Sequence, residues 1–242
     1  MVCEKTKLLK IIPVIPARGG SKRHPRKNVL DLNGKPLIAY SIEAGLNSSY
    51  IDKVVVTSDD DEILTISKKY GAEIIIRPDD LANDMATTVD TVEHVLESVD
   101  LYEYLVLLQP TSPLRTNEHI DEAIQLLEQK NADAIIGVCE TDHSPLWVNT
   151  LPNSKSMDNF LSHEIIGKRS QDLDKHYRIN GAIYICKTDK FIQEKTLFIN
   201  NNYAYEMKRS ASVDIDNRID FILASLLLNE ALFSVAKSDI NA

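Results

Sequence analysis

The 242-residue sequence has few of the residues that cross-link small folds. Its three cysteines, Cys3, Cys139 and Cys186, lie far apart and form no C-x-x-C pair. This spacing argues against a disulfide framework and against a structural zinc site. Cys139 and Cys186 lie in apolar, strand-like segments, so we interpret both as buried free thiols.

Long apolar runs are also missing. No run approaches the roughly 18 consecutive apolar residues that a membrane helix needs. The first ten residues include Glu4, Lys5, Lys7 and Lys10, which is unlike the apolar stretch of a secretory signal. We therefore expect a cytoplasmic protein that does not bind a membrane.

Positive charge is scarce except in one segment. The chain has 27 Lys and Arg against 36 Asp and Glu, a net charge of -9. This balance argues against sequence-independent binding of DNA or RNA, which needs an excess of basic residues. Residues 18–27 nevertheless hold five basic residues, no acidic residue and no aromatic residue. We expect this basic segment to bind a small polyanion rather than a nucleic acid.

The apolar residues follow two alternating patterns. Short β-branched runs, typical of buried strands, lie at 11–15, 53–57, 73–76, 104–108 and 134–138. Between them, apolar residues recur every three or four positions, as on one face of a helix. This alternation predicts an α/β fold in three layers, with a mostly parallel twisted sheet covered by helices on both faces. Ligands then bind beyond the carboxyl ends of the strands.

Local signals predict where two of the helices begin or end. Asp60 and Asp61 are typical of the N-cap and first turn of the helix that follows them. Gly71 is typical of the C-terminal end of the same helix. Thr116 or Asn117 is the expected N-cap of a later helix.

The regular alternation stops near residue 142. Residues 142–177 are polar with scattered apolar positions, and predict an inserted arm within a single domain of residues 1–242. Strand character returns at 182–186 and at 212–215. The apolar pattern that follows predicts a final helix from about Arg218.

The basic segment directly follows the first predicted strand. Gly19 and Gly20 permit close backbone approach, so that several N–H groups can converge on phosphate oxygens. Arg18 adds a planar fork and Lys22 a mobile charge. The segment is neither a Walker A loop nor a G-x-G-x-x-G fingerprint. Phosphate binding is the interpretation we prefer, and a solvated basic turn is the alternative.

Asp214-Ile215-Asp216 is the candidate metal site. On a strand, residues two apart face the same side, so both carboxylates can reach one ion. Mg²⁺ often takes one or two carboxylates together with substrate phosphates and water. The acidic triplet at 59–61 is a competing cluster, which helix capping explains more simply.

Two further segments carry candidate polar contacts. Gln109, after the fourth predicted strand, offers a donor and acceptors suited to a sugar, and Arg115 of the same loop could meet an anion. A rigid strand-to-helix connection explains this loop equally well. Arg178 and Asn180 are candidates for substrate contact, but Asn180-Gly181 is also a common turn signal, which local sequence favours.

Taken together, these motifs resemble the CMP-N-acylneuraminate cytidylyltransferases, also called CMP-sialic acid synthetases, and their relatives acting on legionaminic or pseudaminic acid. The matching segments follow the family's order: I-P-A-R-G-G-S-K…K-N, N-G-K-P-L-I-A-Y-S-I, R-P-x-x-L-A, L-L-Q-P-T-S-P-L-R-T, R-I-N-G-A-I-Y-I and D-I-D. Each motif alone is weak, but the ordered set is specific. The resemblance implies a Rossmann-like nucleotidyltransferase fold.

The resemblance also implies an activity and a set of site residues. The activity is magnesium-dependent transfer of CMP from CTP to a nine-carbon 2-keto sugar acid, by in-line attack of the anomeric hydroxyl and release of pyrophosphate. The implied catalytic residues are Arg18, Lys22, Asp214 and Asp216, of which the two aspartates are the Mg²⁺ ligands. The implied CTP-binding residues are Ala17, Arg18, Gly19, Gly20, Ser21, Lys22, Lys27 and Asn28, and the implied sugar-binding residues are Gln109, Arg178 and Asn180.

Two positions of the arm depart from the sialic acid pattern. Trp147 follows His-x-Pro-Leu, where many members have Lys, and Ser170 stands where others have Arg. Both positions lie toward the sugar end of the family's site, so the sugar stays open. N-acetylneuraminic acid or a relative such as diacetyllegionaminic acid is expected, with Kdo or pseudaminic acid as the alternative. The resemblance further implies a homodimer in which the arm helps to complete the partner's site.

Two other classes of protein share part of this pattern. A glycosyltransferase that consumes a nucleotide sugar would also combine an α/β sheet with an Asp-x-Asp metal pair. The basic segment argues against it, because a grip on a free triphosphate is needed to make a nucleotide sugar. A non-catalytic protein that binds CTP or sialic acid is the other alternative, and release of pyrophosphate would distinguish the two.

Overall fold

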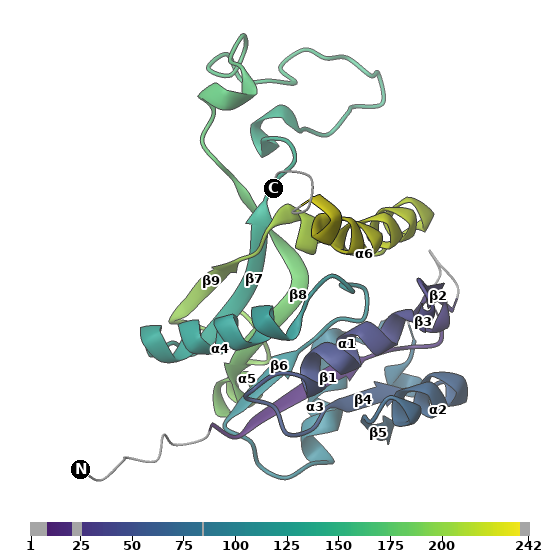
Figure 1. The fold of residues 1–242 in the computed structure, drawn as a ribbon. Coiled ribbons are helices and arrows are strands. Elements are labelled where there is room, and N and C mark those ends of the chain that lie inside the picture. Colours follow the sequence, from purple (N-terminus) through teal and green to yellow (C-terminus); the bar gives the residue numbers. More distant parts are fainter. Residues whose placement is uncertain (1–8, 21–25, 84, 238–242) are drawn as a thin grey trace, which may run out of the picture.

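A seven-stranded sheet forms the centre of the protein (Figure 1). The computed structural model describes residues 9–20, 26–83 and 85–237. The strands, in spatial order, are β5 (Glu73–Ile76), β4 (Val55–Ser58), β1 (Ile11–Pro16), β6 (Tyr104–Leu107), β8 (Tyr177–Lys187), β7 (Ala134–Glu140) and β9 (Asn202–Glu206). Strand β8 runs antiparallel to both of its neighbours, whereas the other described pairs in this sheet are parallel.

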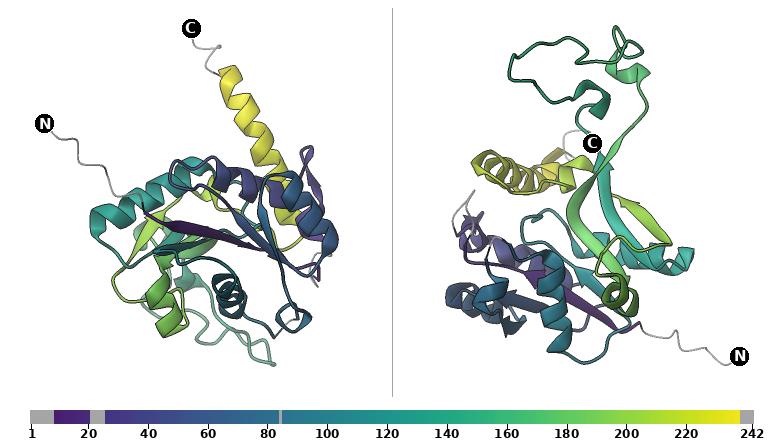
Figure 2. Two further views of the ribbon diagram at one scale, coloured as in Figure 1. Left: turned by 90° about the horizontal axis from the view of Figure 1, so that it is seen from below. Right: turned by 180° about the vertical axis from the view of Figure 1, so that it is seen from behind.

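Helices cover both faces of the sheet, as predicted (Figure 2). They are α1 (Leu37–Leu46), α2 (Asp61–Lys69), α3 (Thr88–Glu97), α4 (Asn117–Lys130) and α5 (Thr188–Glu194). The last helix, α6 (Arg218–Lys237), instead packs in a separate cluster with Leu32, Leu37 and Ile215. Alternate residues of β1 face opposite cores: Ile15 packs in the core beneath α1, α2 and α4, and Val14 in the core beneath α3 and α5. A short hairpin of β2 (Asp31–Leu32) and β3 (Lys35–Pro36) precedes α1.

The predicted ends of the helices are confirmed. The Asp60 carboxylate accepts hydrogen bonds from the backbone N–H groups of Glu62 and Ile63 and so caps α2. Gly71 follows α2 with a φ of 93°, a conformation that glycine adopts without steric cost. Thr116 is the N-cap of α4, and its backbone N–H donates to Nδ1 of His119.

Two predictions about the last third of the chain are wrong. Residues 212–215 form no strand, and the edge of the sheet is instead β9, a strand that we did not predict. The Asn180-Gly181 pair is no turn, since it lies inside β8. The register of β7 and β8 shifts between Ile136 and Val138, and Gly181 has a φ of 74°. The conformational freedom of glycine therefore serves a bulge rather than a chain reversal.

The predicted arm leaves the sheet between β7 and β8. Figure 1 and the right panel of Figure 2 show it extending beyond the ends of these two strands. Its regular structure consists of two short 3-10 turns, Pro145–Trp147 and Ser170–Asp172. Among the helices of the described residues, none combines the length and the apolar character needed to span a membrane.

Candidate active site

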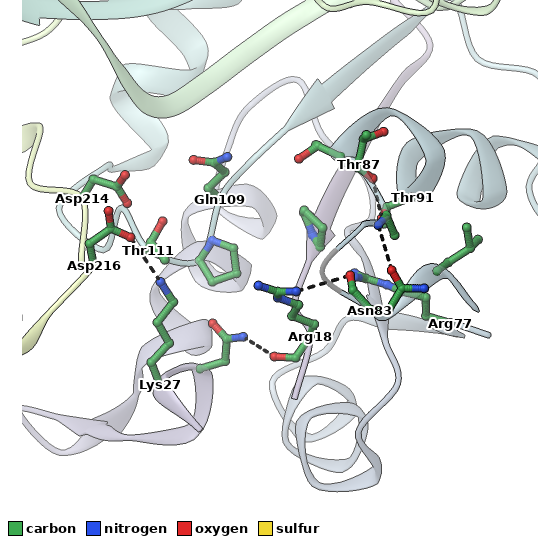
Figure 3. Close-up of a pocket in the computed structure, with 16 residues that line it drawn as sticks. Arg18, Lys27, Arg77, Asn83, Thr87, Thr91, Gln109, Thr111, Asp214 and Asp216 are labelled. Atoms are coloured by element: carbon green, nitrogen blue, oxygen red, sulfur yellow. Dashed lines mark hydrogen bonds and ion pairs between the residues drawn. The ribbon is translucent and has the colours of Figure 1, made fainter. Parts of the chain in front are cut away.

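A hollow lies beyond the carboxyl ends of β1 and β6, where the fold class predicted a ligand (Figure 3). Its walls come from the segments that follow these strands, from the segment between β5 and α3, and from the loop before α6. The lining residues are Pro16, Arg18, Lys27, Asn28, Arg77, Leu81, Asn83, Ala86, Thr87, Thr88, Thr91, Gln109, Pro110, Thr111, Asp214 and Asp216. The predicted phosphate segment and the predicted metal pair therefore meet in one hollow.

The described part of the basic segment contributes side chains to one side of the hollow. Arg18, Lys27 and Asn28 line it. The Asn28 amide nitrogen donates to the backbone carbonyl of Arg18 at 3.1 Å, whereas its amide oxygen is buried with no hydrogen-bond partner among the described residues. An unpartnered buried acceptor is costly unless a ligand supplies the donor. Ser21 and Lys22 lie outside the described residues.

Both described ends of the basic segment are fastened to the start of α2. The backbone N–H of Gly19 donates to Asp59 at 3.0 Å, and a Cβ at Gly19 would lie 2.7 Å from Oδ2 of Asp60. Arg26 forms ion pairs with Asp60, at 2.8 Å, and with Glu62. Burial raises the pKa of the Asp60 carboxyl, but the hydrogen bonds from Ile63 N–H and Arg26 outweigh it and lower that pKa overall. The acidic residues at the start of α2 thus hold both described ends of the basic segment in place.

The opposite wall is formed by residues to which we assigned no role from the sequence. Arg77 is buried, its guanidinium donates to the Thr57 carbonyl at 2.8 Å, and burial lowers its pKa to about 10. Arg18 donates to the Asn83 carbonyl at 3.4 Å, across the hollow. The motif R-P-x-x-L-A was the available signal, since it begins at Arg77. Only the fold shows that this motif faces the basic segment.

The two candidate metal ligands lie together at the other end of the hollow (Figure 3). They belong to an extended segment outside the sheet, held by a hydrogen bond from Ile215 N–H to the Thr111 carbonyl at 2.8 Å. The Lys27 ammonium donates to the Ile215 carbonyl at 2.8 Å and lies 4.0 Å from Asp216. The pairing of the carboxylates is as expected, although the strand that we invoked for it is absent.

The environment of Asp214 suits a cation. One carboxylate oxygen, Oδ1, is buried and has no hydrogen-bond partner among the described residues. Burial, and then the neighbouring Asp216 charge, raise the pKa of Asp214, while Thr111, Lys27 and Arg178 act in the opposite direction. Within the described ranges, no group of three or more His, Cys, Asp or Glu side chains is arranged so that it could hold a metal ion. A metal here would therefore take its remaining ligands from substrate and water.

The three predicted sugar residues occupy different places. Gln109 lines the hollow. Arg178 lines a second hollow, which shares Asp214 and Asp216 with the first. Asn180 is buried, and its amide is used in hydrogen bonds to Ser212 and to the backbone N–H of Ala182, each 3.0 Å long. The structure thus places Asn180 behind the wall, where it supports the segment that leads to Asp214.

The chain matches the family described as cytidylyltransferase over residues 12–217. It belongs to the cytidylyltransferase family. This match covers the basic segment, the Gln109 loop and both carboxylates, and the family membership agrees with the resemblance seen in the motifs.

Curated relatives of this chain carry different names. An N-acylneuraminate cytidylyltransferase of Escherichia coli is 37% identical over 217 residues, which cover 89% of this chain and 51% of the relative. A pseudaminic acid cytidylyltransferase of Campylobacter jejuni is 33% identical, with 90% of this chain and 96% of the relative covered. A CMP-N,N'-diacetyllegionaminic acid synthase of Legionella pneumophila is 34% identical, with 91% and 97% covered. The chain spans about half the length of the N-acylneuraminate relatives it matches, and nearly all of the other two.

Solved structures confirm the predicted fold class. A CMP:2-keto-3-deoxy-manno-octonic acid synthetase in complex with CTP superposes with a TM-score of 0.70 at 19% identity, covering 92% of this chain and 99% of that one. A 4-diphosphocytidyl-2C-methyl-D-erythritol synthase of Anaerococcus prevotii gives 0.64 at 15% identity, covering 91% and 99%. The sheet with helices on both faces is thus the nucleotidyltransferase-like fold seen in these cytidylyltransferases.

Proposed function

We propose that this protein transfers CMP from CTP to a nine-carbon 2-keto sugar acid and releases pyrophosphate. The observation that carries the proposal is the meeting of the basic segment and the Asp214–Asp216 pair in one hollow. The phosphates of a nucleoside triphosphate can contact cationic side chains and a metal ion at the same time. The named relatives at 33–37% identity support a sugar acid as the acceptor.

The nucleotide is proposed to lie between the basic segment and the Arg77 wall. Arg18 and the backbone N–H groups near Gly20 would hold phosphate oxygens, since no atom of the described residues lies within 4 Å of a Cβ built at Gly20. We also place Lys22 in this role, from the sequence. Asn28 would offer its unpartnered amide oxygen to the nucleoside. Holding the charge of the departing pyrophosphate is the main contribution of these groups to catalysis.

We propose Mg²⁺ as the cofactor, held by Asp214 and Asp216. When bound, the ion would acidify the attacking hydroxyl and neutralise phosphate charge. The fit rests on the buried, unpartnered Oδ1 of Asp214 beside a second carboxylate. Lys27 fixes the backbone between them through the Ile215 carbonyl. These contacts keep the two carboxylates directed at one place before any ligand arrives.

The acceptor is proposed to enter through the second hollow. Arg178 lies on that side, where its guanidinium donates to the Ser212 carbonyl at 3.0 Å, and Arg209 of the same hollow pairs with Asp142. A guanidinium there is suited to the acceptor's carboxylate. Gln109 would orient the sugar from the first hollow.

In the proposed reaction, the anomeric oxygen of the acceptor bonds to the α-phosphorus of CTP. The bond from that phosphorus to the pyrophosphate oxygen breaks, and the hydroxyl proton leaves to solvent.

The identity of the acceptor is proposed only as a class. Trp147 and Ser170 line neither of these two hollows in the described chain, so their departures do not act on the site within one copy. N-acetylneuraminic acid and diacetyllegionaminic acid are the preferred acceptors. Pseudaminic acid and Kdo are the alternatives.

Pyrophosphate release with CTP and Mg²⁺ tests the function and the acceptor together. We expect release with at least one acid among N-acetylneuraminic, diacetyllegionaminic, pseudaminic and Kdo acids. Release should stop when a chelator is added or the acid is omitted. No release with any of the four, together with calorimetric binding of CTP, would instead indicate a CTP-binding protein without this activity.

We also propose that two copies pair through the arm. Leu146, Val148, Leu151, Met157 and Ile166 of the arm expose large apolar side chains, and a contact with a second copy would remove this apolar surface from water. Leu223 of α6 is also exposed and lines the second hollow, which it would help to enclose. Sedimentation at assay concentration is expected to give a dimer, and a fully active monomer would contradict the proposal.

A further inference from the structure

A fully buried arginine lies behind the wall of the first hollow. Arg115 is 2% exposed, and no carboxylate contacts its guanidinium within the part of the chain that the structure describes. Burial lowers its pKa to about 9, which leaves it charged at neutral pH. Burying a cation without an anion costs free energy. Ordinary packing could be achieved by a neutral side chain, so the charge needs another explanation.

The guanidinium joins three segments that are distant in the sequence. It donates to the Gln109 carbonyl at 3.2 Å, to the Ala182 carbonyl of β8 at 2.9 Å, and to the Ser41 hydroxyl of α1 at 2.5 Å. Ser41 in turn donates to the Gln109 carbonyl at 3.2 Å. Only the rigid fork of an arginine supplies donors in these directions from one side chain. Arg115 therefore fastens the Gln109 loop to β8 and to α1.

The point that this network holds in place is the beginning of the Gln109 loop. The Gln109 carbonyl accepts from Arg115, from Ser41 and from the Ser112 backbone N–H, the last at 3.3 Å. The Gln109 side chain leaves the same residue and lies against the bulge of β8. A Cβ at Gly181 would lie 2.6 Å from Gln109 Oε1 and 3.7 Å from Asp214 Oδ2. The Gln109 amide and the Asp214 carboxylate thus converge on one side of Gly181, next to Ala182.

We propose that Arg115 is a positioning residue for the acceptor half of the site. By holding both the Gln109 carbonyl and the strand at Ala182, it sets the placement of the Gln109 amide relative to Asp214. This inference rests on the proposed function for its kinetic consequence, because the two groups are those that face the acceptor hydroxyl and the metal. Arg115 itself contacts no substrate and is not a catalytic residue. The anion contact that the sequence suggested for it is not seen.

Two variants and one control test this assignment. Arg115→Lys keeps the charge but replaces the fork with a single ammonium group, which cannot bond all three acceptors. Ser41→Ala removes one acceptor of the Arg115 guanidinium and one donor to the Gln109 carbonyl, and leaves Arg115 itself unchanged. Ser67→Ala is the matched control, since Ser67 is also a buried helical serine and its hydroxyl donates to the Ile63 carbonyl of its own helix, its one hydroxyl bond among the described residues.

The expected result is a selective loss on the acceptor side. For Arg115→Lys, kcat/KM for the sugar acid should fall on the order of tenfold to a hundredfold, as small misplacements of reacting groups do. The dissociation constant of CTP, measured by calorimetry, should change by less than about twofold. The reason is that the Arg115 hydrogen bonds go to neither the basic segment nor the Arg77 wall, between which the nucleotide is proposed to lie. Ser41→Ala should lower kcat/KM for the sugar acid by about threefold. Ser67→Ala should leave both kcat/KM for the sugar acid and the dissociation constant of CTP unchanged.

Equal losses in acceptor use and CTP binding would overturn the inference and indicate a merely structural arginine. If Arg115→Lys does not fold, unchanged acceptor kinetics in Ser41→Ala overturn it as well. A crystal structure of either folded variant gives a readout independent of activity, since the Gln109 amide should move relative to Asp214, and an unmoved amide contradicts the inference. Failure of the wild-type protein to release pyrophosphate contradicts the proposed function alone.

Discussion

Asp214→Asn is expected to lower kcat/KM for pyrophosphate release by about a thousandfold, because a bound metal stabilises transition-state charge by several kcal/mol and each tenfold step corresponds to about 1.4 kcal/mol. An amide offers one neutral oxygen where the carboxylate offers a charge. The same change is expected to raise the melting temperature of the ligand-free protein, since it removes a buried charge whose pKa burial raises. Loss of activity together with a gain in stability is typical of a residue retained for function.

Asp189→Asn is the matched control for this variant. Asp189 lies in the first turn of α5, outside both hollows, and its Oδ1 accepts from the Lys190 backbone N–H at 2.7 Å, a bond that an amide oxygen can keep. Its activity should match the wild type. Titration of Mg²⁺ against turnover separates the outcomes: retained magnesium-dependent turnover in Asp214→Asn would remove the metal role that we propose for this residue.

Arg18→Ala is expected to lower kcat/KM for CTP by about a hundredfold, since a charge-assisted fork on phosphate oxygens is lost where charge accumulates in the transition state. Arg18 lines the hollow between the carboxylates and the Arg77 wall, and its backbone carbonyl holds Asn28. Arg18→Lys should give an intermediate value, because an ammonium supplies the charge without the planar geometry. Steady-state kinetics at saturating sugar acid measure the effect.

Arg26→Ala provides a comparison within the same basic segment. Arg26 is half exposed and pairs with Asp60 and Glu62 of α2, away from the hollow. Exposed ion pairs contribute little, so CTP use should change by less than about threefold. If both alanine variants lost CTP use equally, the phosphates would be held by the summed charge of the segment and not by Arg18.

The regular part of the chain was predictable because its signals are local. The β-branched runs became β1, β4, β5, β6 and β7, and the helical stripes became α2, α3 and α4. The final third was less predictable. The strand β9, Asn-Tyr-Ala-Tyr-Glu, contains no β-branched residue, whereas residues 212–215 look like a strand but pair with no other strand among the described residues. An edge strand needs a partner rather than a strong propensity, and the sequence does not show which segment reaches the sheet edge.

The candidate site was predictable where its residues follow strands directly. Arg18 and Gln109 lie beyond the ends of β1 and β6, and both line the hollow as the fold class requires. Arg77 and Asn83 were missed because nothing in their own segment shows that it faces Arg18. We predicted that Asn180 contacts the sugar, but its side chain is buried. Its amide nitrogen donates to the Ser212 hydroxyl, and its amide oxygen accepts from the Ala182 backbone N–H. Short motifs indicate which residues are polar, and not which of them the fold leaves accessible.

The sequence by itself determined the sheet class, the single basic segment that suits a polyanion, and the presence of two carboxylates at Asp214 and Asp216. These features depend on the order and spacing of residues along the chain. The tertiary structure decided which groups meet: the basic segment with the Arg77 wall, and Arg115 with the Gln109 loop and β8. The contacts from Arg18 to Asn83 and from Arg115 to Ala182 join residues 65 and 67 positions apart, and folding brings them together through the packing of whole elements. Chemical identity was therefore readable from the sequence, whereas accessibility and mutual orientation required the fold.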